Sequence, residues 1–195
     1  MKRLSTFLTL SVITLLVTSF TLKQQATLSV DTGASTLTWT GYHLAKSYSH
    51  TGTLAVKSGS LEMSDGELTG GSFVIDMTSL TNSDLEKAKD NAKLVNHLKS
   101  DDFFDVDKFP EASLEIKSVN SKGGGKYDVT ADLSIRGITK PITFEATQSG
   151  SADAPSIAAK LTVERTQFEV MYGWKIENAM LGGEFDLEVN LKTAK

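Results

Sequence analysis

The sequence predicts an all-β fold with about eight or nine antiparallel strands. Apolar and polar residues alternate along several segments, and turns rich in glycine and serine separate these segments. A single segment shows helical spacing instead. Strands with one apolar face pack their apolar sides together, either as a sandwich or as a closed barrel. The alternation by itself favours neither architecture.

The clearest predicted strand lies near the C-terminus, where Phe185, Leu187 and Val189 alternate with charged or amide side chains. A period of two places these apolar residues on one face of the strand. Further alternating runs occupy residues 37–39, 54–56, 73–77, 114–116, 127–135, 142–146 and 157–163. Each run is expected to contribute one segment of the sheet.

Turn residues separate the predicted strands, as in segments 64–66, 121–125 and 149–151. Residues 136–141 read Arg-Gly-Ile-Thr-Lys-Pro, which predicts a hairpin connection. Because proline lacks the N–H that a sheet ladder requires, we expect Pro141 at the first residue of the following strand. No repeat or long linker interrupts the chain, so residues 27–195 are expected to form one domain.

One segment departs from the strand pattern. Its apolar residues recur at helical spacing, at Leu85, Ala88, Ala92 and Val95. Ser83 and Glu86 have the spacing of a capping box, in which each side chain binds the backbone N–H of the other residue. We therefore expect one amphipathic helix over about residues 83–98. This helix either covers an end or side of the sheet or forms a lid over a cavity.

The N-terminus resembles an export signal. Lys2 and Arg3 precede an apolar run over residues 4–22 that is broken only by serine and threonine. This pattern is typical of a secretory signal peptide, which we assign to residues 1–26, with cleavage after Ser19 or Ala26. The alternative is an uncleaved membrane anchor, for which the run is barely long enough. We expect a periplasmic or secreted protein without a stable membrane span after cleavage.

Composition excludes several kinds of function. The chain has no cysteine, so disulfides and thiolate chemistry are absent. A formal net charge of −4 argues against nucleic-acid binding, which requires clustered basic groups. The three histidines lack the spacing of a zinc site, and no G-x-S-x-G nucleophile motif is present. We therefore expect no metal, no cofactor and no catalytic residues.

Three motifs resemble those of the YceI family. Residues 97–110 read HLKSDDFFDVDKFP, residues 133–142 read LSIRGITKPI, and residues 164–168 read ERTQF. The resemblance implies a lipocalin-like antiparallel barrel with an elongated internal tube. It also implies an exported protein that binds polyisoprenoids or other long-chain amphiphiles. The segment before Asn91 and residues 173–183 differ from many members of the family, so the ligand is the least transferable inference.

Alternation and the resemblance together predict which apolar side chains line such a tube. The candidates are Trp39, Leu54, Val56, Phe73, Ile75, Leu114, Ile116, Leu133, Ile135, Phe144, Val163 and Phe185. The alternative is that these side chains pack against one another and leave no space, as in an ordinary core. The resemblance favours the tube for the set as a whole.

Two polar residues are candidates for binding a ligand headgroup. His50 shares the parity of Leu54 and Val56, which places its ring inward near the end of a strand. The alternative is a hydrogen-bonded or solvent-reaching histidine. Arg165 continues the inward parity of Val163, and a buried arginine requires a partner or an anionic ligand. If the strand instead ends there, Arg165 is free to reach solvent.

These observations predict a protein that binds, sequesters or carries a long-chain apolar ligand, such as an isoprenoid or a quinone-like or fatty amphiphile. Burial of a chain of ~20 carbons gains roughly 16 kcal/mol at about 0.8 kcal/mol per methylene. This gain is larger than the free-energy cost of association, which is about 4–15 kcal/mol. The alternatives are a structural or adhesion β domain with a packed interior, and a hydrolase or isomerase acting on an amphiphile.

Overall fold

The computed structural model describes residues 23–171 and 181–194. The described residues form nine strands, one α-helix and three short 3-10 helices. The strands are β1 (Gln25–Ser29), β2 (Thr36–His43), β3 (Ser49–Ser64), β4 (Glu67–Asp76), β5 (Glu111–Gly123), β6 (Lys126–Ile135), β7 (Ile138–Ser151), β8 (Ala154–Glu164) and β9 (Leu181–Lys192). The helices are η1 (Leu44–Lys46), η2 (Met77–Ser79), α1 (Ala88–Lys99) and η3 (Arg165–Phe168). Most of the predicted signal peptide, residues 1–22, and the divergent residues 173–180 lie outside this part of the chain.

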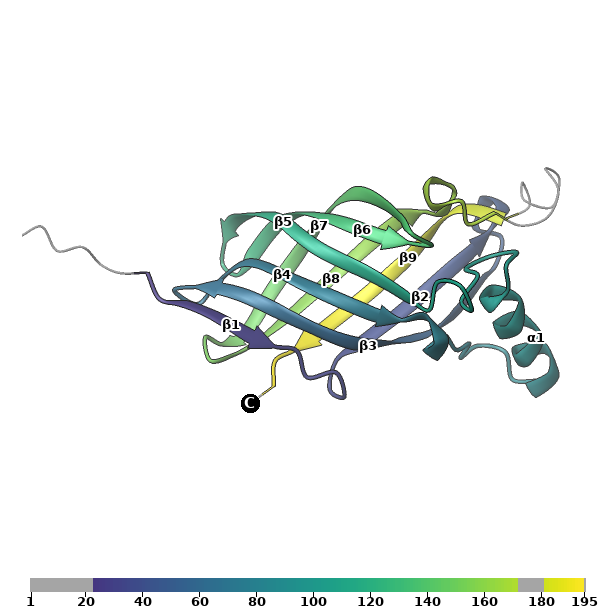
Figure 1. Cartoon of the computed structure of the whole chain (residues 1–195), viewed down its shortest axis with the longest axis horizontal. Coiled ribbons are helices and arrows are strands. Elements are labelled where there is room, and N and C mark those ends of the chain that lie inside the picture. Colours follow the sequence, from purple (N-terminus) through teal and green to yellow (C-terminus); the bar gives the residue numbers. More distant parts are fainter. Residues whose placement is uncertain (1–22, 172–180, 195) are drawn as a thin grey trace, which may run out of the picture.

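The sheet closes into a barrel (Figure 1). All strand pairs are antiparallel, in the order β1-β3-β2-β9-β8-β7-β6-β5-β4, and β3 pairs with β4 to complete the circle. β1 and β2 share one edge of β3, because β3 pairs with β2 over residues 49–54 and with β1 over residues 60–64. The wall therefore has eight strand positions. This confirms the all-β prediction and shows that the sheet forms a barrel and not a sandwich.

Two-residue hairpins set the register of consecutive strands. Arg136 and Gly137 connect β6 to β7 with φ angles of 52° and 75°, and Asp65 and Gly66 connect β3 to β4 in the same way. Turns with two positive φ angles match the right-handed twist of the strands, and glycine adopts that conformation without steric cost. The predicted hairpin at residues 136–141 is thus confirmed, although its turn occupies only the first two positions.

Pro141 is not the first residue of its strand, as we expected, but the fourth residue of β7. In the register set by the Ile135–Ile138 pair, Pro141 lies opposite Asp132 at a position where the backbone nitrogen faces away from β6. The missing N–H would therefore have pointed toward β8. A proline is tolerated inside a strand where that side has no hydrogen-bonded neighbour.

The part of β7 that contains Pro141 is in fact unpaired on the side that faces β8. The ladder between β7 and β8 joins residues 146–151 to residues 154–159. Residues 138–145 and 160–164 of the same strands, all of them described, have no pairing with each other. We call this part of the wall the seam.

At the α1 end of the barrel, Arg136 in the hairpin donates to the carbonyl oxygens of Phe103 and Glu169, at 2.6 and 2.7 Å.

Helix α1 lies across one end of the barrel, opposite the end where β1 and the C-terminus lie (Figure 1). None of its residues is buried, so it covers this end loosely. It begins at Ala88 and not at residue 83, and its N-cap residue, Lys87, makes no side-chain capping bond. The predicted capping box is therefore wrong. No helix among residues 23–171 and 181–194 has the length and apolar character to cross a membrane.

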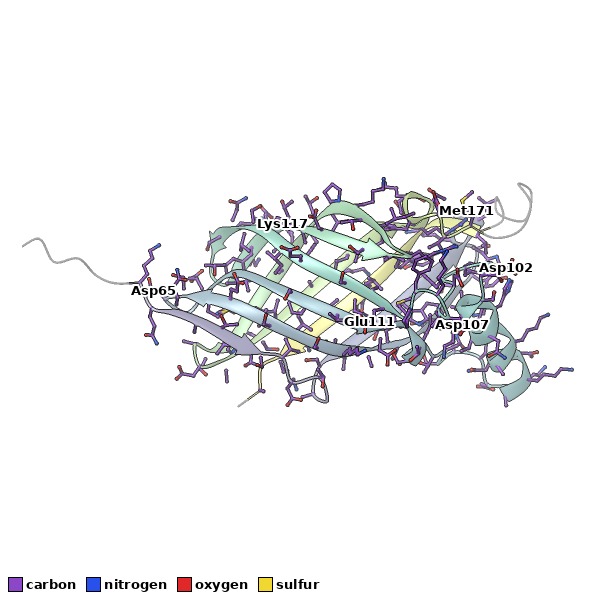
Figure 2. All side chains as sticks on the ribbon, viewed as in Figure 1. Asp65, Asp102, Asp107, Glu111, Lys117 and Met171 are labelled. Atoms are coloured by element: carbon purple, nitrogen blue, oxygen red, sulfur yellow. The ribbon has the colours of Figure 1, made fainter. Side chains whose placement is uncertain are left out.

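The interior contains two apolar clusters that follow one another along the barrel axis. One lies toward α1 and includes Trp39, Phe103 and Phe168. The other lies toward the opposite end and includes Leu61 and Tyr127. Figure 2 marks these ends by labelled residues, with Met171 and Asp102 at the α1 end and Asp65 at the opposite end.

Candidate ligand-binding site

The barrel interior contains two cavities instead of a fully packed core. The outer cavity, at the α1 end, has a volume of about 150 Å³. The inner cavity, toward the opposite end, has a volume of about 70 Å³, and every residue that lines it is apolar. An interior wholly filled by side chains would have no such spaces. Side chains therefore do not fill the interior everywhere.

The predicted lining residues lie where strand parity placed them, with one exception. Trp39, Leu54, Ile135 and Phe185 line the outer cavity. Val56, Phe73, Leu114, Ile116 and Phe144 line the inner cavity. Ile75 and Leu133 line both. Val163 lines neither; it is packed within the core cluster nearer α1.

Four residues line both cavities and so separate them: Leu37, Ile75, Leu133 and Leu187. We call this set the constriction. Its members come from β2, β4, β6 and β9. Leu37, Leu133 and Leu187 are buried, and Ile75 is half-buried. The constriction therefore divides the apolar interior at one level of the barrel.

Several lining residues of the outer cavity come from outside the strands and escaped the sequence prediction. Leu94 and Leu98 of α1, and Phe103 and Phe104 of the following loop, all contribute to its wall. Period-two alternation does not apply to helices and loops. The spacing of Leu94 and Leu98, four residues apart on one helix face, is the signal that could have identified the first two. These four side chains make α1 and its loop a cover over the outer cavity.

Arg165 lies in the wall of the outer cavity and is 7% exposed. Its Nε donates to the Gly182 carbonyl and one of its terminal nitrogens donates to the Val170 carbonyl, both at 2.7 Å. Burial lowers the pKa of the guanidinium from its usual value, but arginine remains charged in proteins. β8 ends at Glu164, yet the side chain does not reach solvent. Arg165 is thus buried and hydrogen-bonded, and the alternative in which it reaches solvent is wrong.

His50 also lines the outer cavity. The carboxylate of Asp84 accepts hydrogen bonds from His50 Nδ1 and from the backbone N–H of Thr51, both at 2.8 Å. Burial opposes the ionisation of Asp84, but these bonds outweigh it and hold the pKa of Asp84 below its usual value. His50 is therefore both inward-facing and hydrogen-bonded, which combines the two alternatives.

The same interactions explain the late start of α1. Asp84, which lies within the helix predicted over about residues 83–98, is instead bound to β3. Asn82 is buried and donates to the Thr51 carbonyl at 2.9 Å, while Asn91 donates to the Asn82 carbonyl at 3.0 Å. These tertiary bonds hold the segment before Ala88 against the barrel in a non-helical conformation. They also fasten the N-terminal part of α1 beside the cavity mouth.

Tyr127 closes the barrel beyond the inner cavity. Its side chain is 1% exposed, and its hydroxyl oxygen lies 2.8 Å from a Glu67 carboxylate oxygen and 3.0 Å from the Gln148 amide oxygen. Gln148 in turn donates to the Gly66 carbonyl at 2.7 Å. Burial, together with the hydrogen bond to Glu67, raises the pKa of the Tyr127 hydroxyl. The ring is thus held in place by a polar network at the end opposite α1.

A second polar cluster lies around Asp186 of β9. The Asp186 carboxylate accepts hydrogen bonds from Thr162 at 2.7 Å and from Tyr42 at 2.9 Å, and Lys160 lies 3.5 Å away. Burial opposes ionisation of Asp186, but these three partners together lower its pKa below the usual value. The cluster ties β2, β8 and β9 together.

Asp186→Asn is expected to reduce the free energy of unfolding by about 1–3 kcal/mol at neutral pH, because hydrogen bonds to a charged group are lost. A pKa depressed in the folded state stabilises the protein above the unfolded value of about 3.9, and this contribution disappears as the pH falls through the folded value. Urea unfolding should therefore show a larger difference between variant and wild type at pH 7 than at pH 3. The exposed Asp153→Asn is the matched control and should change neither. An equal effect of Asp186→Asn at both pH values would contradict the prediction.

A closed eight-stranded barrel with an enclosed apolar interior defines a class of β-barrels that can hold a small ligand. The model of the YceI-like domain matches residues 28–193. The chain therefore belongs to the YceI-like domain family, as the sequence motifs indicated.

Relatives of known sequence agree with this assignment. A UPF0312 protein of Vibrio parahaemolyticus is 43% identical over 82 residues, which are 42% of this chain and 40% of that protein. A UPF0312 protein of Pseudomonas fluorescens is 33% identical over 140 residues, which are 68% of this chain and 69% of that protein. The match to the Vibrio protein thus spans less than half of that protein's length.

Solved structures share the fold. BcnA of Burkholderia cenocepacia has a TM-score of 0.71 at 19% identity, over 85% of this chain and 99% of that one. A polyisoprenoid binding domain from Saccharophagus degradans has a TM-score of 0.63 at 15% identity, over 87% of this chain and 98% of that one. At these identities the similarity establishes the barrel architecture.

Proposed function

We propose that the protein binds a long-chain apolar ligand inside its barrel and sequesters or carries it. The observation that supports this most directly is the outer cavity, about 150 Å³ in volume and bounded largely by aliphatic and aromatic side chains. An empty apolar cavity of about that size is known to bind benzene-sized molecules. A tail that also reached the inner cavity would bury more apolar surface and so bind more tightly.

The polar residues that line the outer cavity support an amphiphilic ligand. Arg165, His50 and Glu184 are among its lining residues, whereas the inner cavity has no polar lining residue. A headgroup would therefore lie toward α1, and the tail would point toward Tyr127. The solved polyisoprenoid binding domain of similar fold supports an isoprenoid, quinone-like or fatty tail.

We also propose that the protein acts by binding and not by catalysis. The guanidinium of Arg165 is held by backbone carbonyls, and the His50 ring is paired with Asp84. Side chains engaged in this way position the wall of the cavity. The charged and apolar pattern of residues 1–22 supports export to the periplasm or the outside of the cell, where the protein would bind its ligand.

Native mass spectrometry of the protein purified from cells tests this proposal. We expect a population heavier than the polypeptide by the mass of an apolar molecule, which organic extraction removes. After extraction, a fluorescent fatty acid should bind and gain emission, because the cavity shields it from water.

Two alanine-to-phenylalanine variants give a matched control. Ala112 is buried and lines the outer cavity, so Ala112→Phe should fill the cavity and weaken binding at least about tenfold, or 1.4 kcal/mol. Ala158 is exposed on β8, so Ala158→Phe should bind as the wild type does. A bare polypeptide mass together with no binding of the fluorescent fatty acid would overturn the proposal.

A further inference from the structure

The four residues of the constriction occupy equivalent places along their strands. On β9, Phe185 lines only the outer cavity, Leu187 lines both, and Val189 lines only the inner cavity. On β2, Trp39 lines the outer cavity and Leu37 lines both. Because alternate residues of a strand face the same side, the order along each strand is the order along the barrel axis.

The opposite wall repeats this order. On β6, Ile135 lines only the outer cavity, Leu133 lines both, and Val129 lines only the inner cavity. On β4, Ile75 lines both and Phe73 lines only the inner cavity. β2 and β9 are neighbours in the barrel, whereas β4 and β6 flank β5 elsewhere in the circle. The constriction is therefore formed by side chains that approach from two parts of the wall at one level.

The cavity sizes show why this level matters. The outer cavity holds about 150 Å³, the size that accommodates a benzene-like body, so a longer tail cannot fit there in full. The inner cavity offers about 70 Å³ more, lined by apolar residues alone. Tyr127 and Leu68, both buried, lie at its far end. A tail that enters through the mouth reaches the inner cavity by passing between the four side chains of the constriction.

We propose that the constriction, formed by Leu37, Ile75, Leu133 and Leu187, selects ligands by the length of their hydrocarbon tail. This inference rests on the proposed function. Short tails occupy the outer cavity and leave the constriction closed. Tails that exceed the outer cavity displace these side chains from their packed rotamers and extend into the inner cavity. The constriction thus makes tail length, and not only the headgroup, a determinant of specificity.

The proposal predicts a characteristic dependence of affinity on length. Each methylene that leaves water adds about 0.8 kcal/mol, which is about fourfold in affinity. Affinity should rise at this rate while the outer cavity fills. It should then stop rising over the lengths at which each further methylene must displace the constriction. Beyond those lengths the rise should resume, since the inner cavity is apolar and accepts further methylenes.

The experiment measures the affinity of the wild-type protein, stripped of bound lipid, for primary alcohols of about 6 to 16 carbons, by displacement of the fluorescent fatty acid. Leu133→Phe narrows the constriction and should weaken the binding of long alcohols at least about tenfold more than the binding of short ones. Leu133→Ala widens it and should abolish the plateau. Leu54→Ala, which alters only the outer cavity, is the matched control and should keep the plateau.

The outcomes separate the two proposals. If the wild type binds no alcohol and no fluorescent fatty acid, the proposed function itself fails. If affinity rises uniformly with length, or if both Leu133 variants change all lengths equally, the protein binds apolar ligands but the constriction does not select them. If Leu133→Phe fails to fold, Leu133→Ala still tests the proposal. Loss of the plateau changes the shape of the curve of affinity against alcohol length, and a general loss of affinity would not.

Discussion

Replacing Tyr127 with alanine is expected to lower the free energy of unfolding by about 3–5 kcal/mol, the range measured for truncation of large buried aromatic residues. The ring is almost completely buried and closes the apolar interior beyond the inner cavity. Its loss leaves a cavity that the barrel wall cannot fill. It also removes the hydroxyl that lies between Glu67 and Gln148. Urea unfolding followed by circular dichroism measures the change.

Tyr127→Phe separates the ring from its hydroxyl. This variant keeps the packed ring and loses only the hydrogen bonds, which contribute about 0.5–1.5 kcal/mol each. We therefore expect it to be much less destabilised than Tyr127→Ala. If the two variants unfolded at the same urea concentration, the polar network and not the buried ring would close this end of the barrel.

Replacing Arg165 with methionine is expected to lower the free energy of unfolding by about 2–4 kcal/mol, since buried acceptors left without a donor cost about 1–3 kcal/mol each. The carbonyls of Gly182 and Val170 would both lose the guanidinium that now binds them. Methionine keeps much of the length of the side chain, so the effect reports the lost bonds. Arg165→Lys should recover little, because a single ammonium lacks the planar fork that reaches both carbonyls.

Lys126→Met is the control for the removal of a positive charge. Lys126 is exposed at the start of β6, and surface substitutions of this kind change stability by about 0.5 kcal/mol or less. Both methionine variants are compared by urea unfolding at neutral pH. Equal unfolding midpoints for Arg165→Met and Lys126→Met would show that the buried guanidinium bonds contribute nothing to the fold.

Much of the fold could be predicted from the sequence because each strand has one apolar face. The alternation around Phe185 and Leu187 corresponds to β9, whose inward residues it identified. The choice between sandwich and barrel could not be made locally, since closure depends on the pairing of β3 with β4 and on β1 and β2 sharing one edge. Register across strands is a property of the assembled sheet.

Failures of the sequence analysis arise where tertiary contacts override local propensity. The capping box at Ser83 and Glu86 did not form, because Asp84 and Asn82 bind β3 instead of starting a helix. For the site, strand parity identified most of the wall but not α1, whose Leu94 and Leu98 follow a different period. Strand alternation identifies inward-facing residues, but it cannot distinguish those that line a cavity from those, such as Val163, that pack against neighbouring side chains.

The seam between residues 138–145 of β7 and 160–164 of β8 has a mechanical consequence. Where neighbouring strands are paired, an increase in circumference requires the rupture of ladder hydrogen bonds. Along the seam, it requires only that side-chain contacts between the two strands separate, which costs weak dispersion contacts. The wall should therefore be more compliant here than along its paired strands, so that ligands of different width can separate these two half-strands.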